Sequence, residues 1–311
     1  MTAVKGFGTL SAADVLIGEI PLGQLVPIVN ASPNPPGKVQ NVSSAVTNII
    51  LGRTIDGAST VIIQLQDSTR SILRSGIFDF GLTLTLDGLN FALVAFTKAG
   101  DQLQLTFESA AVYNLRQQKG AMNWPSTSDL SGFAQHLISA TPGATLVCQP
   151  GPVSFATGAG SLASSTETSI ARGTTANPTE DSWTCLNRLF NSAGWRIFEC
   201  EGQITAGSDS WLLTESPSAG TIEEFTTAVQ VIDGSYDIGM PLGQLTVAAM
   251  NEKWEAKPGQ PITAANMGPF SGVWLVYALQ RNNFNPQGSM TLQTPMTPEQ
   301  VRVGVPTLQN V

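Results

Sequence analysis

The sequence of 311 residues predicts a mainly β protein in which an α+β insert lies between two small β-barrels. Apolar and polar residues alternate with a period of two in 45–115 and again in 221–295, and turn-forming residues separate the alternating runs. Two helical patterns lie between these regions. We therefore divide the chain into an N-terminal arm, a first barrel, an insert, a second barrel and a C-terminal tail, at residues 1–44, 45–115, 116–220, 221–295 and 296–311.

The N-terminal arm, residues 1–44, contains prolines at positions 21, 27, 33, 35 and 36, which exclude a long helix or a central strand. Apolar residues such as Val15, Leu16 and Ile17 are nevertheless too frequent for a free disordered tail. We expect an extended arm that becomes ordered on a neighbouring subunit or another protein.

The first barrel is predicted from alternating runs. Val61, Ile63 and Leu65 share one face of a strand, and Asp87-Gly88 is typical of a tight hairpin turn. The corresponding apolar positions of the other strands are Leu82, Leu84, Leu86, Leu89, Phe91, Leu93, Leu103, Leu105 and Phe107. Four or more short strands of this kind indicate a small barrel or sandwich.

The insert begins with an amphipathic helix that follows the capping residues Ser128 and Asp129 and ends at Pro142-Gly143. Its apolar face consists of Leu130, Phe133, Ala134, Leu137 and Ile138. Residues 150–179 are rich in Gly, Ser, Thr and Ala and are predicted to be a long loop or linker.

A second helix follows Pro178-Thr179, with Glu180 and Asp181 in the first turn, where carboxylates favour the positive end of the helix dipole. Its apolar face consists of Trp183, Leu186, Leu189, Phe190 and Ala193, and Gly194 ends it. Residues 195–200 and 203–206 form a predicted hairpin around Glu201-Gly202. Helix and hairpin together make a small α/β module, in which we expect Trp183 and Trp195 to be buried.

The second barrel is predicted from strands at 229–232, 245–247, 272–279 and 290–292. Turns are expected at Asp233-Gly234, Lys257-Pro258-Gly259 and Asn285-Pro286-Gln287-Gly288. The string Pro-Leu-Gly-Gln-Leu occurs at 21–25 and again at 241–245. It is either a trace of duplication or a chance match.

The composition restricts the possible partners. Charged residues make up 12% of the chain, against about 25% in an average protein, so much of the surface is expected to be covered by partners. A net charge of −8 argues against binding nucleic acid through its phosphates. The N-terminus lacks a signal-peptide pattern and no apolar run is long enough to span a membrane. We expect a soluble protein made in a reducing cytoplasm.

No catalytic, cofactor-binding or metal-ligating residues are predicted. His136 is the single histidine, and it falls on the polar side of its helix. Cys148, Cys185 and Cys200 lack metal-site spacing and are interpreted as separate buried thiols. Glu223-Glu224 is interpreted as solvated charge, because adjacent carboxylates diverge. The glycines of 158–160 suit a flexible turn, and core packing is the expected role of Trp124, Trp183, Trp195, Trp211, Trp254 and Trp274.

Three stretches resemble the tail-tip or baseplate hub proteins of tailed bacteriophages, especially the minor tail proteins of siphophages that infect actinobacteria. The first is 52–60 with Gln66-Asp67, which resembles the opening barrel of the family. The second combines Arg172-Gly173, 180–183, Arg188-Leu189 and 193–198, and it also resembles the helix-and-hairpin insert of contractile-phage hubs and type VI secretion spikes. The third comprises 250–254, Pro258-Gly259, 268–269 and 272–276, and resembles the closing barrel.

The resemblance implies a non-enzymatic virion protein of the tail tip, assembled in the host cytoplasm, that caps the tail tube and surrounds the DNA exit path. It implies a homotrimer with two tail-tube-like barrels per chain, so that three copies present six similar surfaces to a sixfold tube. Expected partners are the distal tail protein, the tape-measure protein and other tail-tip or fibre proteins, with no cofactor and no sequence-specific binding of nucleic acid. The channel wall is expected not to be basic. The alternatives are a distal-tail ring protein, a carbohydrate-binding receptor module or, less favoured, a cell-wall hydrolase that acts through carboxylates.

Overall fold

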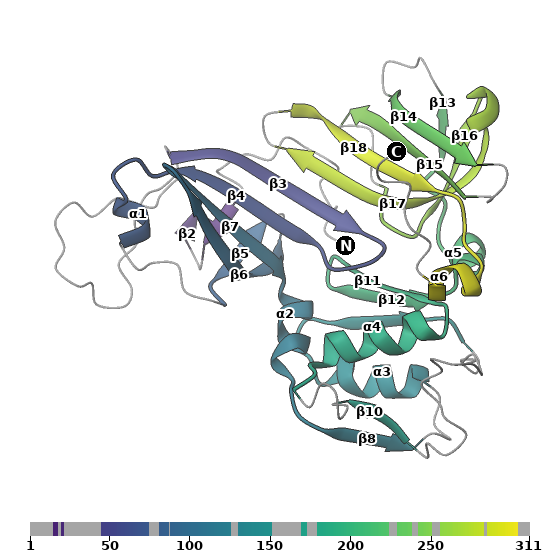
Figure 1. Cartoon of the computed structure of the whole chain (residues 1–311), viewed down its shortest axis with the longest axis horizontal. Coiled ribbons are helices and arrows are strands. Elements are labelled where there is room, and N and C mark those ends of the chain that lie inside the picture. The colour runs from purple at the N-terminus through teal and green to yellow at the C-terminus, as the bar shows by residue number, and fades with distance from the viewer. Residues whose placement is uncertain are drawn as a thin grey trace.

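A computed structural model of the chain describes residues 15–17, 20–21, 45–74, 81–86, 88–125, 130–150, 169–172, 179–223, 229–237, 242–250, 256–282 and 285–303. Two β regions lie next to each other, and a smaller part that contains most of the helices lies below the place where they meet (Figure 1). The predicted mainly β fold with an α/β insert is confirmed.

Most of the strands belong to one sheet of 13 strands. Its main path runs through β14 (Val229–Asp237), β15 (Leu242–Met250), β18 (Asn285–Gln293), β17 (Gly272–Asn282), β3 (Val46–Thr54), β4 (Thr60–Gln66), β7 (Gln102–Ser109), β6 (Leu89–Ala99), β5 (Thr83–Leu86), β1 (Val15–Ile17) and β2 (Ile20–Pro21). β16 (Pro261–Ala265) pairs with β17 and with β13 (Thr221–Glu223).

The two β regions are joined edge to edge, because β17 pairs antiparallel with β3, for example Leu279 with Arg53. Closure of either region into a separate barrel is not detected within the described residues, so the two barrels stay a prediction. The pairing of β3 with β17 satisfies backbone groups that a free edge would leave exposed. We call β3 to β7 the first half-sheet and β14 to β18 the second half-sheet.

The two half-sheets have the same topology. If the five strands of each half-sheet are numbered 1 to 5 along the chain, their order across the sheet is 1-2-5-4-3. In the first half-sheet this order is β3-β4-β7-β6-β5, and in the second it is β14-β15-β18-β17-β16. Both long strands, β6 and β17, have 11 residues and a register shift at the sixth, Val94 or Tyr277. Leu93 and Val276 therefore occupy equivalent positions. Leu93 lies opposite Phe107 in β7, and Val276 lies opposite Leu292 in β18. The chain contains an internal structural repeat.

The hydrophobic core follows the repeat, because equivalent positions on the ladder point to the same face of the sheet. Equivalent pairs are buried in both half-sheets: Val61 and Leu245, Ile63 and Val247, Leu84 and Ile262, Phe91 and Trp274, Leu105 and Met290, and Phe107 and Leu292. The repeated pentapeptide is not a trace of this repeat. Pro21 lies in β2, outside the half-sheets, whereas residues 242–245 lie in β15, the equivalent of β4.

The insert contains α2 (Ala110–Gln117), β8 (Met122–Pro125), α3 (Leu130–Ser139), β9 (Thr145–Cys148), β10 (Ser169–Arg172), α4 (Ser182–Ser192), β11 (Arg196–Cys200), β12 (Gln203–Gly207) and α5 (Asp209–Glu215). β11 and β12 form the predicted hairpin, and β9 adds to it in parallel. The apolar faces predicted for α3 and α4 are buried against this sheet, and Trp183 and Trp195 are only 4% and 7% exposed. Shorter elements elsewhere are α1 (Ser71–Arg74), the 3-10 turn η5 (Gly268–Phe270) and α6 (Pro298–Val303).

The start of α4 differs from the prediction in detail. Asp181 is the N-cap, and its carboxylate accepts a hydrogen bond from the backbone N–H of Thr184 at 2.8 Å. Glu180 lies one residue before this N-cap. Its Oε1 forms an ion pair with Nε of Arg188 in α4 at 2.7 Å. Gly194 has a φ of 78° and ends the helix as predicted.

Two predicted turns are wrong, and the described part of a predicted linker contains a strand. Asp233-Gly234 lies inside β14, where a side chain at position 234 would approach Phe270 and Leu245 too closely. Residues 285–288 belong to β18, and residues 150–179 include β10, which pairs with β8. Glycine and proline mark these segments as breaks, but pairing with a neighbouring strand outweighs that preference.

Of the predicted arm, the structure describes β1 and β2, and β1 pairs with β5 of its own chain. The rest of the arm, the capping residues Ser128 and Asp129, and residues 304–311 lie outside the described residues. Docking of the arm on a neighbour stays a prediction, as do the proposed domain boundaries.

Candidate functional site

One face of the large sheet is open, and most of its described side chains on the central strands are uncharged. The exception on β7 is Glu108, which lies opposite Thr60 and forms an ion pair with Arg116 at 2.9 Å. Along β4, Val61, Ile63 and Leu65 point into the core, whereas Thr60, Ile62 and Gln64 point away from it. The register places the following partly or fully exposed residues on the same side: Asn48, Gly52, Thr54, Gln104, Thr106, Gln244, Thr246, Ala278, Gln280, Ser289, Thr291 and Gln293. We call this set, with the three residues of β4, the open face.

Side-chain amides connect neighbouring strands of the open face. Asn48 Nδ2 donates to Gln64 Oε1 at 3.3 Å, and Gln64 Nε2 donates to Gln104 Oε1 at 3.4 Å. The face continues across the junction of β3 and β17, where Gly52, Gln280 and Thr291 help to line a shallow depression of about 370 Å³. The open face therefore spans both half-sheets as one surface of mostly uncharged side chains. Amides and hydroxyls alternate there with apolar residues, and Ile50 and Ile62 also line the depression at the junction.

A buried ion network fixes the insert to both half-sheets beside this junction. Arg196 of β11 donates from Nη1 to Asp56 Oδ1 at 2.7 Å and from Nε to Asp209 Oδ1 at 3.0 Å. Tyr277, the shifted residue of β17, donates from its hydroxyl to Asp56 Oδ2 at 2.7 Å. The Arg196 and Asp209 side chains are 7% and 1% exposed, and the backbone N–H of Met296 also donates to Asp209, at 2.8 Å.

The charges of this network shift the pKa values of its members. Burial alone would lower the pKa of Arg196, but Asp209 and Asp56 hold that pKa above its ordinary value. Burial, together with the adjacent Asp56 carboxylate, raises the pKa of the Tyr277 hydroxyl. Both groups therefore keep their protons and remain donors at neutral pH.

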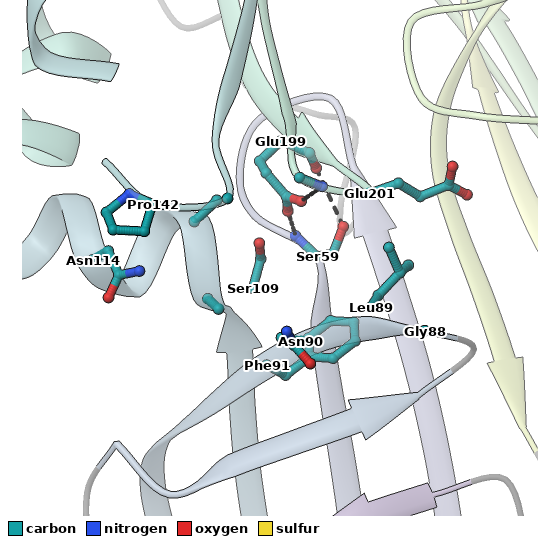
Figure 2. A pocket seen from close by; sticks show the side chains of 14 residues that line it. Ser59, Gly88, Leu89, Asn90, Phe91, Ser109, Asn114, Pro142, Glu199 and Glu201 are labelled. Atoms are coloured by element: carbon teal, nitrogen blue, oxygen red, sulfur yellow. Dashed lines mark hydrogen bonds between the residues drawn. The ribbon is translucent and has the colours of Figure 1, made fainter. Parts of the chain in front are cut away.

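The hairpin turn between β11 and β12 makes a second set of contacts. The Glu199 carboxylate is 1% exposed and accepts hydrogen bonds from the backbone N–H groups of Ser59 at 3.0 Å and Gly202 at 2.6 Å (Figure 2). Glu201 forms ion pairs with Arg53 at 3.1 Å and Lys257 at 2.5 Å. These pairs link β3 and the segment before β16 through the insert.

A pocket of about 340 Å³ lies between the start of α2, the turn before β6 and the hairpin turn (Figure 2). Its polar side chains are those of Ser59, Asn90, Ser109, Asn114, Glu199 and Glu201, and no described His, Cys, Lys or Arg lines it. Because both oxygens of Glu199 accept backbone hydrogen bonds, that carboxylate is held in a structural role. The Glu201 carboxylate is engaged by Arg53 and Lys257, so both carboxylates that line the pocket already have partners within the protein.

Among the candidate residues that the structure describes, His136 and Glu223 lie on different elements. His136 is exposed on α3, Glu223 is exposed in β13, and Glu224 and residues 158–160 lie outside the described residues. The described part of the chain contains no cluster of three His, Cys, Asp or Glu side chains that could hold a metal ion. None of its helices has the length and hydrophobicity needed to cross a bilayer.

The three cysteines are separate free thiols. Cys185 and Cys200 are buried, and burial raises their pKa values to about 12 and about 11. Cys148 is partly exposed, contrary to the prediction of three buried thiols, because even the inward-facing residues of the edge strand β9, Leu146 and Cys148, are only partly covered. None of the four described tryptophan side chains, at positions 183, 195, 211 and 274, is exposed, so these four do not form a stacking platform.

The sequence did not predict the residues that connect the insert to the two half-sheets. Asp56, Arg196, Asp209 and Tyr277 come from different segments of the chain. The nearest usable signal was the presence of two charged residues, Arg196 and Glu199, in a largely apolar predicted strand. The open face was visible as the polar half of each alternating strand, but its continuity depends on the pairing of β3 with β17.

The fold is that of phage tail proteins, as the resemblance of the sequence implied. A tail protein from Neisseria meningitidis MC58 superimposes with a TM-score of 0.53 and 11% identity, over 83% of this chain and 94% of the other. The 43 kDa tail protein of prophage MuSo2 from Shewanella oneidensis gives a TM-score of 0.50 and 8% identity, over 82% and 94%. No protein-family model matches the sequence, and no curated protein is similar to it.

Proposed function

We propose that this chain is a structural, non-enzymatic component of a bacteriophage tail. In this role it forms the hub at the tail tip as a ring of three copies around the path of the DNA. The internal repeat is the observation that carries the proposal. Two half-sheets of identical strand order and matching register are joined edge to edge, so three chains supply six similar elements. Such a ring matches a sixfold tube and saturates its contacts by closed symmetry.

The open face supports a position around DNA. It presents mainly Thr, Ser, Asn and Gln over both half-sheets, with Arg116 paired to Glu108 at its border, and the chain as a whole carries a net charge of −8. Neutralising phosphates requires basic side chains. A channel lined by the open face therefore lets DNA slide past without holding it, whereas a basic wall would bind it.

The junction network supports a mechanical rather than a catalytic role. Arg196, Glu199 and Glu201 fix the insert to both half-sheets, so that load on one half-sheet passes to the other through buried charge pairs as well as through β3 and β17. Neighbours in the particle are then the distal tail protein, the tape-measure protein and other tail-tip or fibre proteins.

Two measurements on the full chain test this function. Native mass spectrometry should show a trimer, and antibodies raised against the chain should label one end of the tail in electron micrographs of particles that contain it. Labelling along the whole tail or on the capsid would contradict the hub. A hexamer of the full chain would favour the alternative of a distal-tail ring, and release of sugar or peptide fragments from cell wall would favour the hydrolase.

A further inference from the structure

The two half-sheets repeat the same topology, but the edge-to-edge pairing that joins them, which we call the junction, occurs once among the described strands. Inside the chain, β3 of the first half-sheet lies beside the Ala278–Asn282 part of β17 in the second half-sheet. In the repeat, β14 is the equivalent of β3, and β6 is the equivalent of β17. The two strands that would form a second copy of this junction, β14 and β6, therefore lie far apart in the sheet of one chain (Figure 1).

The exposure of the two long strands differs where the junction forms. In β17, Leu279 and Arg281 are each 5% exposed. The equivalent residues of β6, Phe96 and Lys98, are exposed, and Phe96 reaches 41%, which is unusual for a large apolar side chain. The β6 segment thus carries a large, partly exposed apolar residue at the position that a junction would bury.

The other partner is β14. Among the described strands it pairs with β15 alone and stands at the end of the sheet. Its nine residues match the nine of β3, and Ser235 is exposed. An edge strand of this length is a template for pairing with another chain.

We propose that β14 of one copy lies against the Ala95–Ala99 segment of β6 in the next copy, in the register that β3 takes on β17. This inference rests on the proposed trimeric ring and names its interface. Within the chain, Gly52 lies opposite Gln280. The equivalent positions are Ser235 and Thr97, so these two residues face each other between copies. The contact joins two different surfaces head to tail, and a threefold ring closes it with three junctions inside chains and three between them.

The test is an engineered disulfide in the full chain, Thr97→Cys with Ser235→Cys. Within one chain β14 and β6 are separated by seven strand-to-strand steps along the sheet, or about 30 Å if the sheet is nearly flat. A disulfide needs Cα atoms within about 7 Å, so only a contact between copies can form it. Mild oxidation should give covalent dimers and trimers on a non-reducing gel, and reduction should return the monomer.

The matched control is Thr97→Cys with Gln244→Cys. Gln244 lies opposite Ser235 on β15, one strand further from the proposed partner, which places it about 10 Å from position 97. The control pair should stay uncrosslinked under the same oxidation, since the three native cysteines are common to both variants. Equal cross-linking of both pairs would overturn the proposed register.

The outcomes separate this inference from the function on which it rests. A trimer in native mass spectrometry that never cross-links through 97 and 235 overturns the interface and leaves the hub intact. A chain that stays monomeric overturns both. Phe96→Glu provides a second measurement: it should leave the tryptophan fluorescence of the folded chain unchanged and shift the oligomer towards monomer, whereas an unchanged oligomer would contradict the burial of Phe96 between copies.

Discussion

Arg196→Met removes the central charge of the junction network and keeps most of the length of the side chain. The substitution leaves Asp209, which is 1% exposed, without its positive partner, and it also releases Asp56 of the first half-sheet. Removing one member of a buried ion pair costs about 3–5 kcal/mol. We therefore expect the free energy of unfolding to fall by that amount in urea titrations followed by tryptophan fluorescence.

Two further variants identify the cause of this loss. Asp209→Asn in the Arg196→Met background removes the uncompensated charge and retains an acceptor for the backbone N–H of Met296, so it should recover about 1–3 kcal/mol. Lys257→Met removes an ion pair whose lysine is 43% exposed, and Glu201 keeps Arg53 as a partner, so it should cost about 0–1 kcal/mol. An Arg196→Met loss no larger than that of Lys257→Met would refute the proposed role of the network.

Four other predictions concern the packing, the buried thiols and the arm. Trp183→Ala should destabilise the insert by about 3–5 kcal/mol, because it empties a buried site, and an unchanged melting temperature would contradict this. At pH 8 iodoacetamide should modify Cys148 well before Cys185 and Cys200, as mass spectrometry of the folded chain can show, and equal rates would contradict their burial. Since burial raises the pKa of both buried thiols from 9.0, their contribution to stability is complete below pH 9 and is lost as the pH rises through 11 and 12. Deleting residues 1–44 should leave the remainder folded by circular dichroism but weaken assembly; aggregation of the truncated chain would assign the arm to the core.

Local patterns in the sequence predicted the elements whose residues alternate or repeat clearly. The buried faces of β4 and α3 follow directly from periods of two and 3.6, since each side chain direction is set by its own backbone. Burial of Trp183 and Trp195 followed in the same way. These features needed no knowledge of distant parts of the chain.

The continuity of the sheet could not be predicted in this way. The pairing of β3 with β17 joins residues more than 200 positions apart through backbone groups, and backbone hydrogen bonds leave no trace in residue identity. The repeat was hidden for a related reason. Equivalent core positions are filled by different apolar residues, such as Phe91 and Trp274, because a sheet core selects volume and hydrophobicity rather than a particular side chain.

Electron cryomicroscopy of an intact particle that contains this protein would measure its copy number and the orientation of its sheet together. We predict three copies around the tail axis, with six half-sheets in a ring and Gln64, Gln104 and Gln280 of the open face directed towards the channel. Six copies in the ring, or an open face buried against another protein away from the channel, would contradict the assignment of this chain as the hub around the DNA path.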